Sequence, residues 1–234
     1  MLKAILFDLD GTLLPMNQEQ FIDLYKKTIY DKAQECGYDG AELLNTIQMS
    51  IYKMVNNDGS KTNDVVFKQA FVDADIESIL DDTRFSCEYY NNEFLLLKKA
   101  CYYNKDSKII IDFLKSKGYK IVVATNPVWP AIATQQRVKW AGLNPNDFDF
   151  YTTYENSSYC KPNVLYYQEI LNKLGCTPEE CLMVGNDVGE DMIAGKLGIK
   201  TFLLTDCLIN PHNLPTDHYV QGDFKKLLEY IESL

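Results

Sequence analysis

At residues 4–13 the chain reads Ala-Ile-Leu-Phe-Asp-Leu-Asp-Gly-Thr-Leu, a short apolar run that ends in two aspartates and a glycine. Continuous apolar runs of this kind are typical of parallel strands covered on both faces. If strand geometry persists, Asp8 and Asp10 point the same way, and Gly11 permits a tight turn after them. The stretch predicts a first strand with two carboxylates at its carboxyl end, although an Asp-Gly turn can also be an ordinary solvated loop.

Three later apolar runs, at 120–124, 181–184 and 201–204, predict further strands of the same type. Helical patterns that stop at a glycine lie around them, at 109–117, 131–141, 164–174 and 192–197. Thr177, Pro178 and Glu180 form a capping-box signature. This alternation from residue 105 onward predicts right-handed crossovers and an α/β fold with a Rossmann-like parallel sheet.

Residues 18–103 follow a different pattern, because helical spacing recurs there without a convincing strand. Phe21, Leu24 and Tyr25 lie at such spacing, and the turn-rich segment 56–60 divides the block into helical pairs. The sequence therefore predicts a helical insertion between the first strand and the rest of the sheet.

The composition is that of an ordinary globular protein of 234 residues, with 46% apolar and 24% charged residues. A net charge of −10 and the lack of a basic cluster argue against nucleic acid as a partner. We expect no membrane association and a cytoplasmic protein, because no apolar run approaches a bilayer-spanning length and residues 4–7 are too short for a signal-peptide core. The seven scattered cysteines predict reduced core thiols, with a reactive Cys160 beside Lys161 as the alternative.

Polar side chains also follow the later strands. Thr125 and Asn126 can donate hydrogen bonds to a phosphoryl group, and Lys161 precedes a helix whose positive end suits an anion. The segment 185–191 offers oxygen ligands for a hard cation. Each feature alone can also be interpreted as a helix cap, a surface lysine or an acidic loop. The hypothesis of a phosphate and metal site therefore rests on their order along the chain.

Taken in that order, D-x-D-G-T-L at 8–13, Thr125, Lys161-Pro162 and N-D-x-x-x-D at 186–191, the sequence resembles the haloacid dehalogenase-like hydrolase superfamily. The resemblance implies a core domain formed by residues 1–14 and 104–234 and a helical cap domain formed by residues 15–103. Such a cap excludes water and selects substrates. Asn17 and Arg84 are candidate substrate contacts in it, with a surface role as the alternative for Arg84.

The resemblance also implies a role for each matching position. Asp8 is the expected nucleophile, and Asp10 is the expected general acid and base. Mg²⁺ is the expected cofactor, held by Asp8, Asp187 and the backbone carbonyl of Asp10. The expected phosphate-binding residues are Thr125, Asn126 and Lys161; Asn186 is expected near the metal, and Asp191 is expected to orient Lys161 or a metal-bound water.

These roles predict a magnesium-dependent phosphatase that hydrolyses a small phosphorylated metabolite through an aspartyl-phosphate. Asp10 disfavours dehalogenation, because that reaction does not need an acid and base at this position. Two alternatives stay open: a phosphomutase that uses the same intermediate, and a catalytically silent phosphate-binding module. The sequence predicts neither the substrate nor the oligomeric state.

Overall fold

The computed structural model describes residues 1–233 and contains a six-stranded sheet of order β3-β2-β1-β4-β5-β6. All neighbouring strands pair in parallel. The strands are β1 (Ala4–Phe7), β2 (Lys120–Val123), β3 (Phe150–Tyr151), β4 (Cys181–Gly185), β5 (Lys200–Leu204) and β6 (Val220–Gly222). The predicted α/β class with a Rossmann-like parallel sheet is confirmed.

Strand β1 lies at the point where the strand order reverses, between β2 and β4. Its side chains alternate between two cores. Ile5 and Phe7 belong to the larger apolar cluster, whereas Ala4 and Leu6 belong to a second one. Helices therefore cover both faces of the sheet, which explains why all four residues are apolar and buried.

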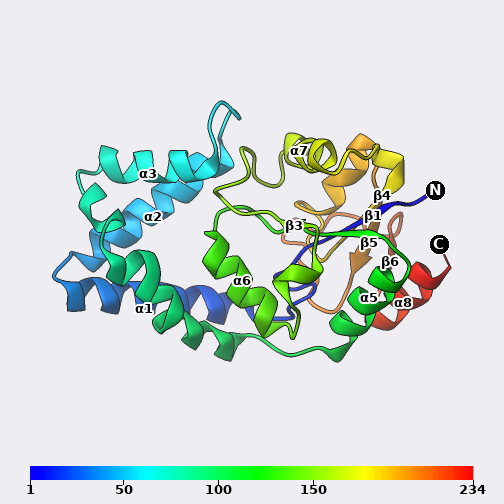
Figure 1. The fold of residues 1–234 in the computed structure, drawn as a ribbon, viewed down its shortest axis with the longest axis horizontal. Helices are drawn as coiled ribbons and strands as arrows, with labels where there is room; N and C mark the ends of the chain where they lie inside the picture. The colour runs from blue at the N-terminus through cyan, green and yellow to red at the C-terminus, as the bar shows by residue number, and fades with distance from the viewer. Residues whose placement is uncertain (234) are drawn as a thin grey trace.

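The larger cluster includes side chains of α5 (Lys105–Ser116), α6 (Ala131–Trp140) and α8 (Phe224–Glu232). The second cluster includes side chains of α7 (Val164–Leu174) and of the 3₁₀ segment η6 (Met192–Leu197). Figure 1 shows α7 on the side of the sheet opposite α5 and α8. Short 3₁₀ turns, η4 (Pro145–Asp147) and η5 (Pro178–Glu180), precede β3 and β4.

Three details differ from the expectation. The segment 192–197, predicted as an α-helix, is a 3₁₀ helix. The capping-box segment forms only the short turn η5, in which the Thr177 backbone N–H donates to Glu180 Oε2 at 3.1 Å. Strands β3 and β6 were not predicted. They have two and three residues, too few for a recognisable apolar run.

Helices make up most of the segment between β1 and α5. They are α1 (Gln18–Cys36), α2 (Gly40–Val55), α3 (Asn63–Asp73), η1 (Glu77–Leu80), η2 (Arg84–Glu88), α4 (Tyr89–Asn91) and η3 (Glu93–Ala100). In Figure 1 helices α1, α2 and α3 lie at the end of the molecule remote from both termini. The predicted turn at 56–60 separates α2 from α3. Treating residues 15–103 as a cap domain on a core of 1–14 and 104–234 stays a prediction.

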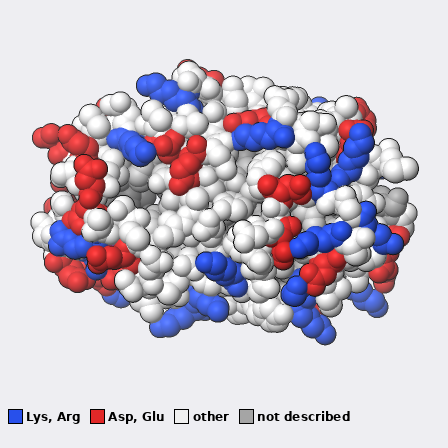
Figure 2. Space-filling model, viewed as in Figure 1, with Lys and Arg blue, Asp and Glu red and all other residues white. Residues whose placement is uncertain are grey.

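Two surface properties bear on partners. Among residues 1–233 no helix combines the length and apolarity needed to cross a bilayer. Figure 2 shows acidic and basic side chains interspersed over the face in view rather than gathered by sign.

Candidate active site

The carboxyl ends of the central strands bring the predicted site residues to one edge of the sheet. Phe7, the last residue of β1, is paired with Val123 on β2 and with Val184 on β4. The Asp8 backbone N–H then donates to Val184 O at 2.9 Å. The residues that follow the three strands therefore begin side by side at the switch point, where open α/β sheets bind ligands.

The Lys161 side chain is buried at this edge of the sheet, between two carboxylates. Its Nζ lies 2.8 Å from Asp8 Oδ1 and 2.6 Å from Asp191 Oδ1, and its side chain is 1% exposed. Burial acts to lower the pKa of Lys161, but the negative charges of Asp191 and Asp8 outweigh it and hold the pKa well above its usual value. The ammonium therefore stays charged beside the Asp8 carboxylate.

Asp191 connects Lys161 to the acidic loop. Its Oδ2 accepts the backbone N–H of Asp187 at 2.9 Å while Oδ1 accepts the Lys161 bond. A side chain at Gly185 would meet Asp191 Oδ2 at 2.1 Å, so a glycine is required there. This geometry agrees with the predicted role of Asp191 in orienting Lys161.

Asp187 lies at the start of a turn after β4. Its Oδ1 accepts the backbone N–H groups of Gly189 at 2.7 Å and Glu190 at 2.8 Å. Those bonds fix the carboxylate at the edge of the sheet. Glu190 was not predicted as a site residue; burial raises the pKa of its carboxyl to about 7, and Lys161 opposes that shift.

Asp10 has a partner that the sequence analysis missed. The fully buried Arg137 on α6 donates from Nη1 to Asp10 Oδ2, and its Nη2 donates to Thr134 Oγ1 at 3.2 Å. Burial raises the pKa of Asp10, and the Arg137 guanidinium opposes that shift. The sequence did contain one indication of this partner. Arg137 is one of two arginines in the chain, and it shares a helix face with the buried residues Ala133 and Val138.

Thr125 and Asn126 follow β2 at the same edge. The Thr125 carbonyl accepts bonds from Thr152 Oγ1 at 2.6 Å and Tyr166 OH at 2.9 Å, which fixes the backbone of the loop. Asn126 Nδ2 donates to Glu190 Oε2 at 3.1 Å, while its Oδ1 is buried without a hydrogen-bond partner among the described residues. Asn126 thus connects the β2 and β4 loops, and its predicted contact with a phosphoryl group stays a prediction.

Asn186 holds the turn after Asp10 in place. Its Oδ1 accepts Thr12 Oγ1 at 2.8 Å, and its Nδ2 donates to Cys207 O at 2.7 Å. Gly11 has φ +88°, and a Cβ there would lie 2.4 Å from Asn186 Nδ2. The expected glycine turn is therefore present, and both the backbone conformation and the close approach demand it.

The expected metal ligands have suitable chemistry. Among residues 1–233 there is no group of three or more His, Cys, Asp or Glu side chains that could hold a metal. The predicted magnesium site does not require one, because its ligands are two carboxylates and a backbone carbonyl. The hydrogen bonds of Asp8 and Asp187 within that range involve Oδ1 of each carboxylate, so neither uses Oδ2. Hard oxygen donors of this kind fit Mg²⁺.

Three other expectations concern residues outside the set of expected site residues. Asn17 caps α1 by accepting the Gln20 backbone N–H at 3.0 Å, and Arg84 pairs with Asp82 at 2.5 Å, so both act within the helical insertion in this structure. Cys160 is 1% exposed, and burial raises the pKa of its thiol to about 12. A buried thiol with a raised pKa argues against the reactive alternative.

Comparison with known proteins places these features in context. The sequence model of a family described as haloacid dehalogenase-like hydrolase matches residues 2–198. The glyceraldehyde 3-phosphate phosphatase of Methanothermobacter thermautotrophicus is 29% identical over 212 residues, which cover 87% of this chain and 86% of the relative. A putative pyrophosphatase PpaX of Clostridium perfringens is 29% identical over 203 residues, covering 86% and 83%.

Solved structures show the same fold. A HAD phosphatase from Thermococcus onnurineus superposes with a TM-score of 0.59 at 20% identity and covers 98% of both chains. A 2-haloacid dehalogenase from Pseudomonas syringae gives a TM-score of 0.61 at 16% identity, covering 100% of this chain and 99% of the other. At these identities the likeness concerns the fold, which supports both reaction types.

Proposed function

Because this chain belongs to the haloacid dehalogenase-like hydrolase family, we propose that it is a magnesium-dependent phosphatase that hydrolyses a small phosphorylated metabolite through a phosphoryl group on Asp8. The observation that carries this proposal is the buried Lys161, held 2.8 Å from Asp8 Oδ1 and 2.6 Å from Asp191 Oδ1. A fixed cation beside a carboxylate is suited to bind the phosphoryl group that the carboxylate attacks.

In the first step an Asp8 oxygen forms a bond to phosphorus while the ester P–O bond breaks. Lys161 binds the phosphoryl oxygens, and the Thr125 hydroxyl adds an uncharged donor at the next strand end. Asp191 keeps Lys161 directed at this point. Asp191 thus positions the phosphate-binding cation without touching the reacting atoms.

Asp10 moves the protons. In its protonated form it gives its proton to the departing ester oxygen, and it then takes a proton from the water that attacks the aspartyl-phosphate. Burial raises the pKa of Asp10, which favours the protonated form that the first step needs. Arg137 holds Oδ2, whereas Oδ1 is buried and has no partner among the described residues. Because Oδ2 accepts from Arg137, the proton of the neutral form is carried on Oδ1.

Asp8, Asp187 and the Asp10 carbonyl would hold Mg²⁺, which offsets the repulsion between the Asp8 carboxylate and the phosphoryl oxygens. The relatives support this reaction class, since their names describe phosphatases and pyrophosphatases. We also propose a cytoplasmic protein with a small-molecule substrate and no nucleic-acid or membrane partner.

A panel of phosphate monoesters tests the proposal, with phosphate release measured for the wild-type protein and for Asp8→Asn, in Mg²⁺ and in EDTA. We expect release that needs both Asp8 and Mg²⁺ and that proceeds without a sugar bisphosphate primer. A primer requirement would favour the phosphomutase. No release by folded wild-type protein from any ester, or equal release by Asp8→Asn, would overturn the proposal.

A further inference from the structure

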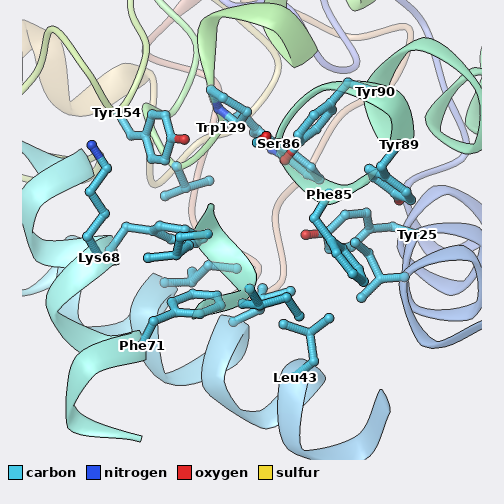
Figure 3. A pocket seen from close by; sticks show the side chains of 18 residues that line it. Tyr25, Leu43, Lys68, Phe71, Phe85, Ser86, Tyr89, Tyr90, Trp129 and Tyr154 are labelled. Atoms are coloured by element: carbon cyan, nitrogen blue, oxygen red, sulfur yellow. The ribbon is translucent and has the colours of Figure 1, made fainter. Parts of the chain in front are cut away.

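A pocket of about 240 Å³ lies between the helical insertion and the core. Figure 3 shows its side chains directed inward from several helices, with Tyr154 and Trp129 on the core side and Leu43 and Phe71 on the insertion side. The helices α1, α2 and α3 each contribute to its wall, for example through Ile29, Ile47 and Phe67. The pocket is thus formed jointly by both parts of the chain.

The wall of this pocket is largely aliphatic and aromatic. Among the described lining residues the one charged side chain is Lys68, whose Nζ lies 3.0 Å from Asp64 Oδ2. The Tyr89 hydroxyl in the wall already shares a hydrogen bond of 2.9 Å with Thr28 Oγ1. A second phosphoryl group or a carboxylate placed here would lose its hydration without gaining an unpaired cation.

The core side of the pocket borders the loop that carries Thr125, since Val128 and Trp129 of that loop line it. Trp129 lines the pocket four positions after Thr125, and its carbonyl accepts the Tyr154 backbone N–H at 3.0 Å. The Arg137 guanidinium carbon lies 5.2 Å from the centre of the Trp129 ring, and Arg137 pairs with Asp10. A single side chain, Arg137, therefore connects a pocket-lining ring to the proposed acid and base.

We propose that this pocket receives the leaving group of the substrate and that the leaving group is predominantly apolar. This inference rests on the proposed function. The substrate class is an alkyl or aryl phosphate monoester rather than a sugar phosphate, a phosphorylated carboxylic acid or pyrophosphate. A dry apolar cavity of roughly 150 Å³ is large enough for benzene. The larger volume here, about 240 Å³, therefore accepts a group larger than one ring.

Paired substrates test this inference. We expect kcat/KM for hexyl phosphate and phenyl phosphate to exceed that for glycerol phosphate by about tenfold or more, since even one methylene in an apolar pocket changes specificity by roughly 10-fold or more. Hexanol, the product alcohol, should change the Trp fluorescence by binding near Trp129. This binding signal does not depend on turnover.

Two variants on α2 provide a matched comparison. Ile47→Phe fills the pocket, whereas Met49→Phe adds a ring at a position that is 52% exposed and does not line it. Ile47→Phe should lower kcat/KM for hexyl phosphate about tenfold, lower that for glycerol phosphate much less, and weaken hexanol binding. Met49→Phe should match the wild type. If Ile47→Phe does not fold, Ser86→Phe fills the pocket from its exposed rim.

The outcomes separate this inference from the proposed function. Asp8-dependent release that favours glycerol phosphate, or equal effects of Ile47→Phe on all esters, would overturn the inference and leave the phosphatase intact. Release that does not depend on Asp8 would instead remove the proposed function. Hexanol binding that survives Ile47→Phe unchanged would also contradict the assignment of this pocket.

Discussion

Loss of Arg137 should destabilise the protein in a pH-dependent way. The side chain is fully buried and pairs with Asp10, whose side chain is 22% exposed. Removing one partner of a buried ion pair costs about 3 to 5 kcal/mol, and the partial exposure of Asp10 brings the expected loss for Arg137→Met to about 2 to 3 kcal/mol at pH 8. Urea unfolding in EDTA measures this difference.

The pH dependence follows from Asp10. Burial already raises its pKa, and loss of the opposing guanidinium raises it further. A carboxyl with a folded pKa above its unfolded value stabilises the protein at low pH, and that contribution is lost as pH rises through the folded pKa. The deficit of Arg137→Met relative to the wild type should therefore be smaller at pH 5 than at pH 8.

The chain provides a matched control, since its second arginine also pairs with an aspartate. Arg84 pairs with Asp82 in the insertion, and because the Arg84 side chain is 44% exposed, Arg84→Met should change stability much less than Arg137→Met. A double-mutant cycle with Asp10→Asn should assign most of the Arg137 loss to the pair. Equal losses for both arginine variants, or a loss independent of pH, would refute the reasoning.

Three further predictions concern the site loops. Gly11→Ala should unfold at lower urea, because φ +88° costs an L-residue about 1 to 2 kcal/mol and its Cβ would clash with Asn186. Burial raises the pKa of Glu190 to about 7, so ionisation of this carboxyl destabilises the folded wild type. In EDTA, the stability of Glu190→Gln relative to the wild type should therefore increase by up to about 3 kcal/mol as pH rises from 4.5 to about 7. A difference that does not depend on pH would contradict this. Iodoacetamide at pH 8 should label the exposed Cys87 well before Cys160, as peptide mass mapping can measure.

Much of the sheet could be predicted because its central strands are apolar on both faces. The first strand is observed as β1 with the expected bounds, Ala4–Phe7. Strands β3 and β6 escaped prediction because two or three residues, most of them partly exposed, carry no such pattern. The order of motifs also sufficed for the family assignment, which the family match over residues 2–198 confirms.

The predictable part of the site is the part fixed by strand ends. Parallel pairing aligns the residues that follow β1, β2 and β4, so Asp8, Thr125 and Asp187 could be grouped without coordinates. Arg137 could not be placed, because its partner Asp10 lies 127 positions away and only helix packing brings them together. Contacts such as Asn126 with Glu190 depend on the same kind of tertiary information.

The central claim is that Asp8 carries the phosphoryl group. In Asp10→Asn the second step should slow, because no group takes the proton from water. With Mg²⁺ and an ester whose leaving group departs without a proton, such as 4-nitrophenyl phosphate, the first step should still proceed and the intermediate should accumulate. Acid-quenched protein, digested and analysed by mass spectrometry, should then carry one phosphoryl group on Asp8. A phosphoryl group on another residue, or turnover of the ester with none detected on Asp8 in this variant, would contradict the account.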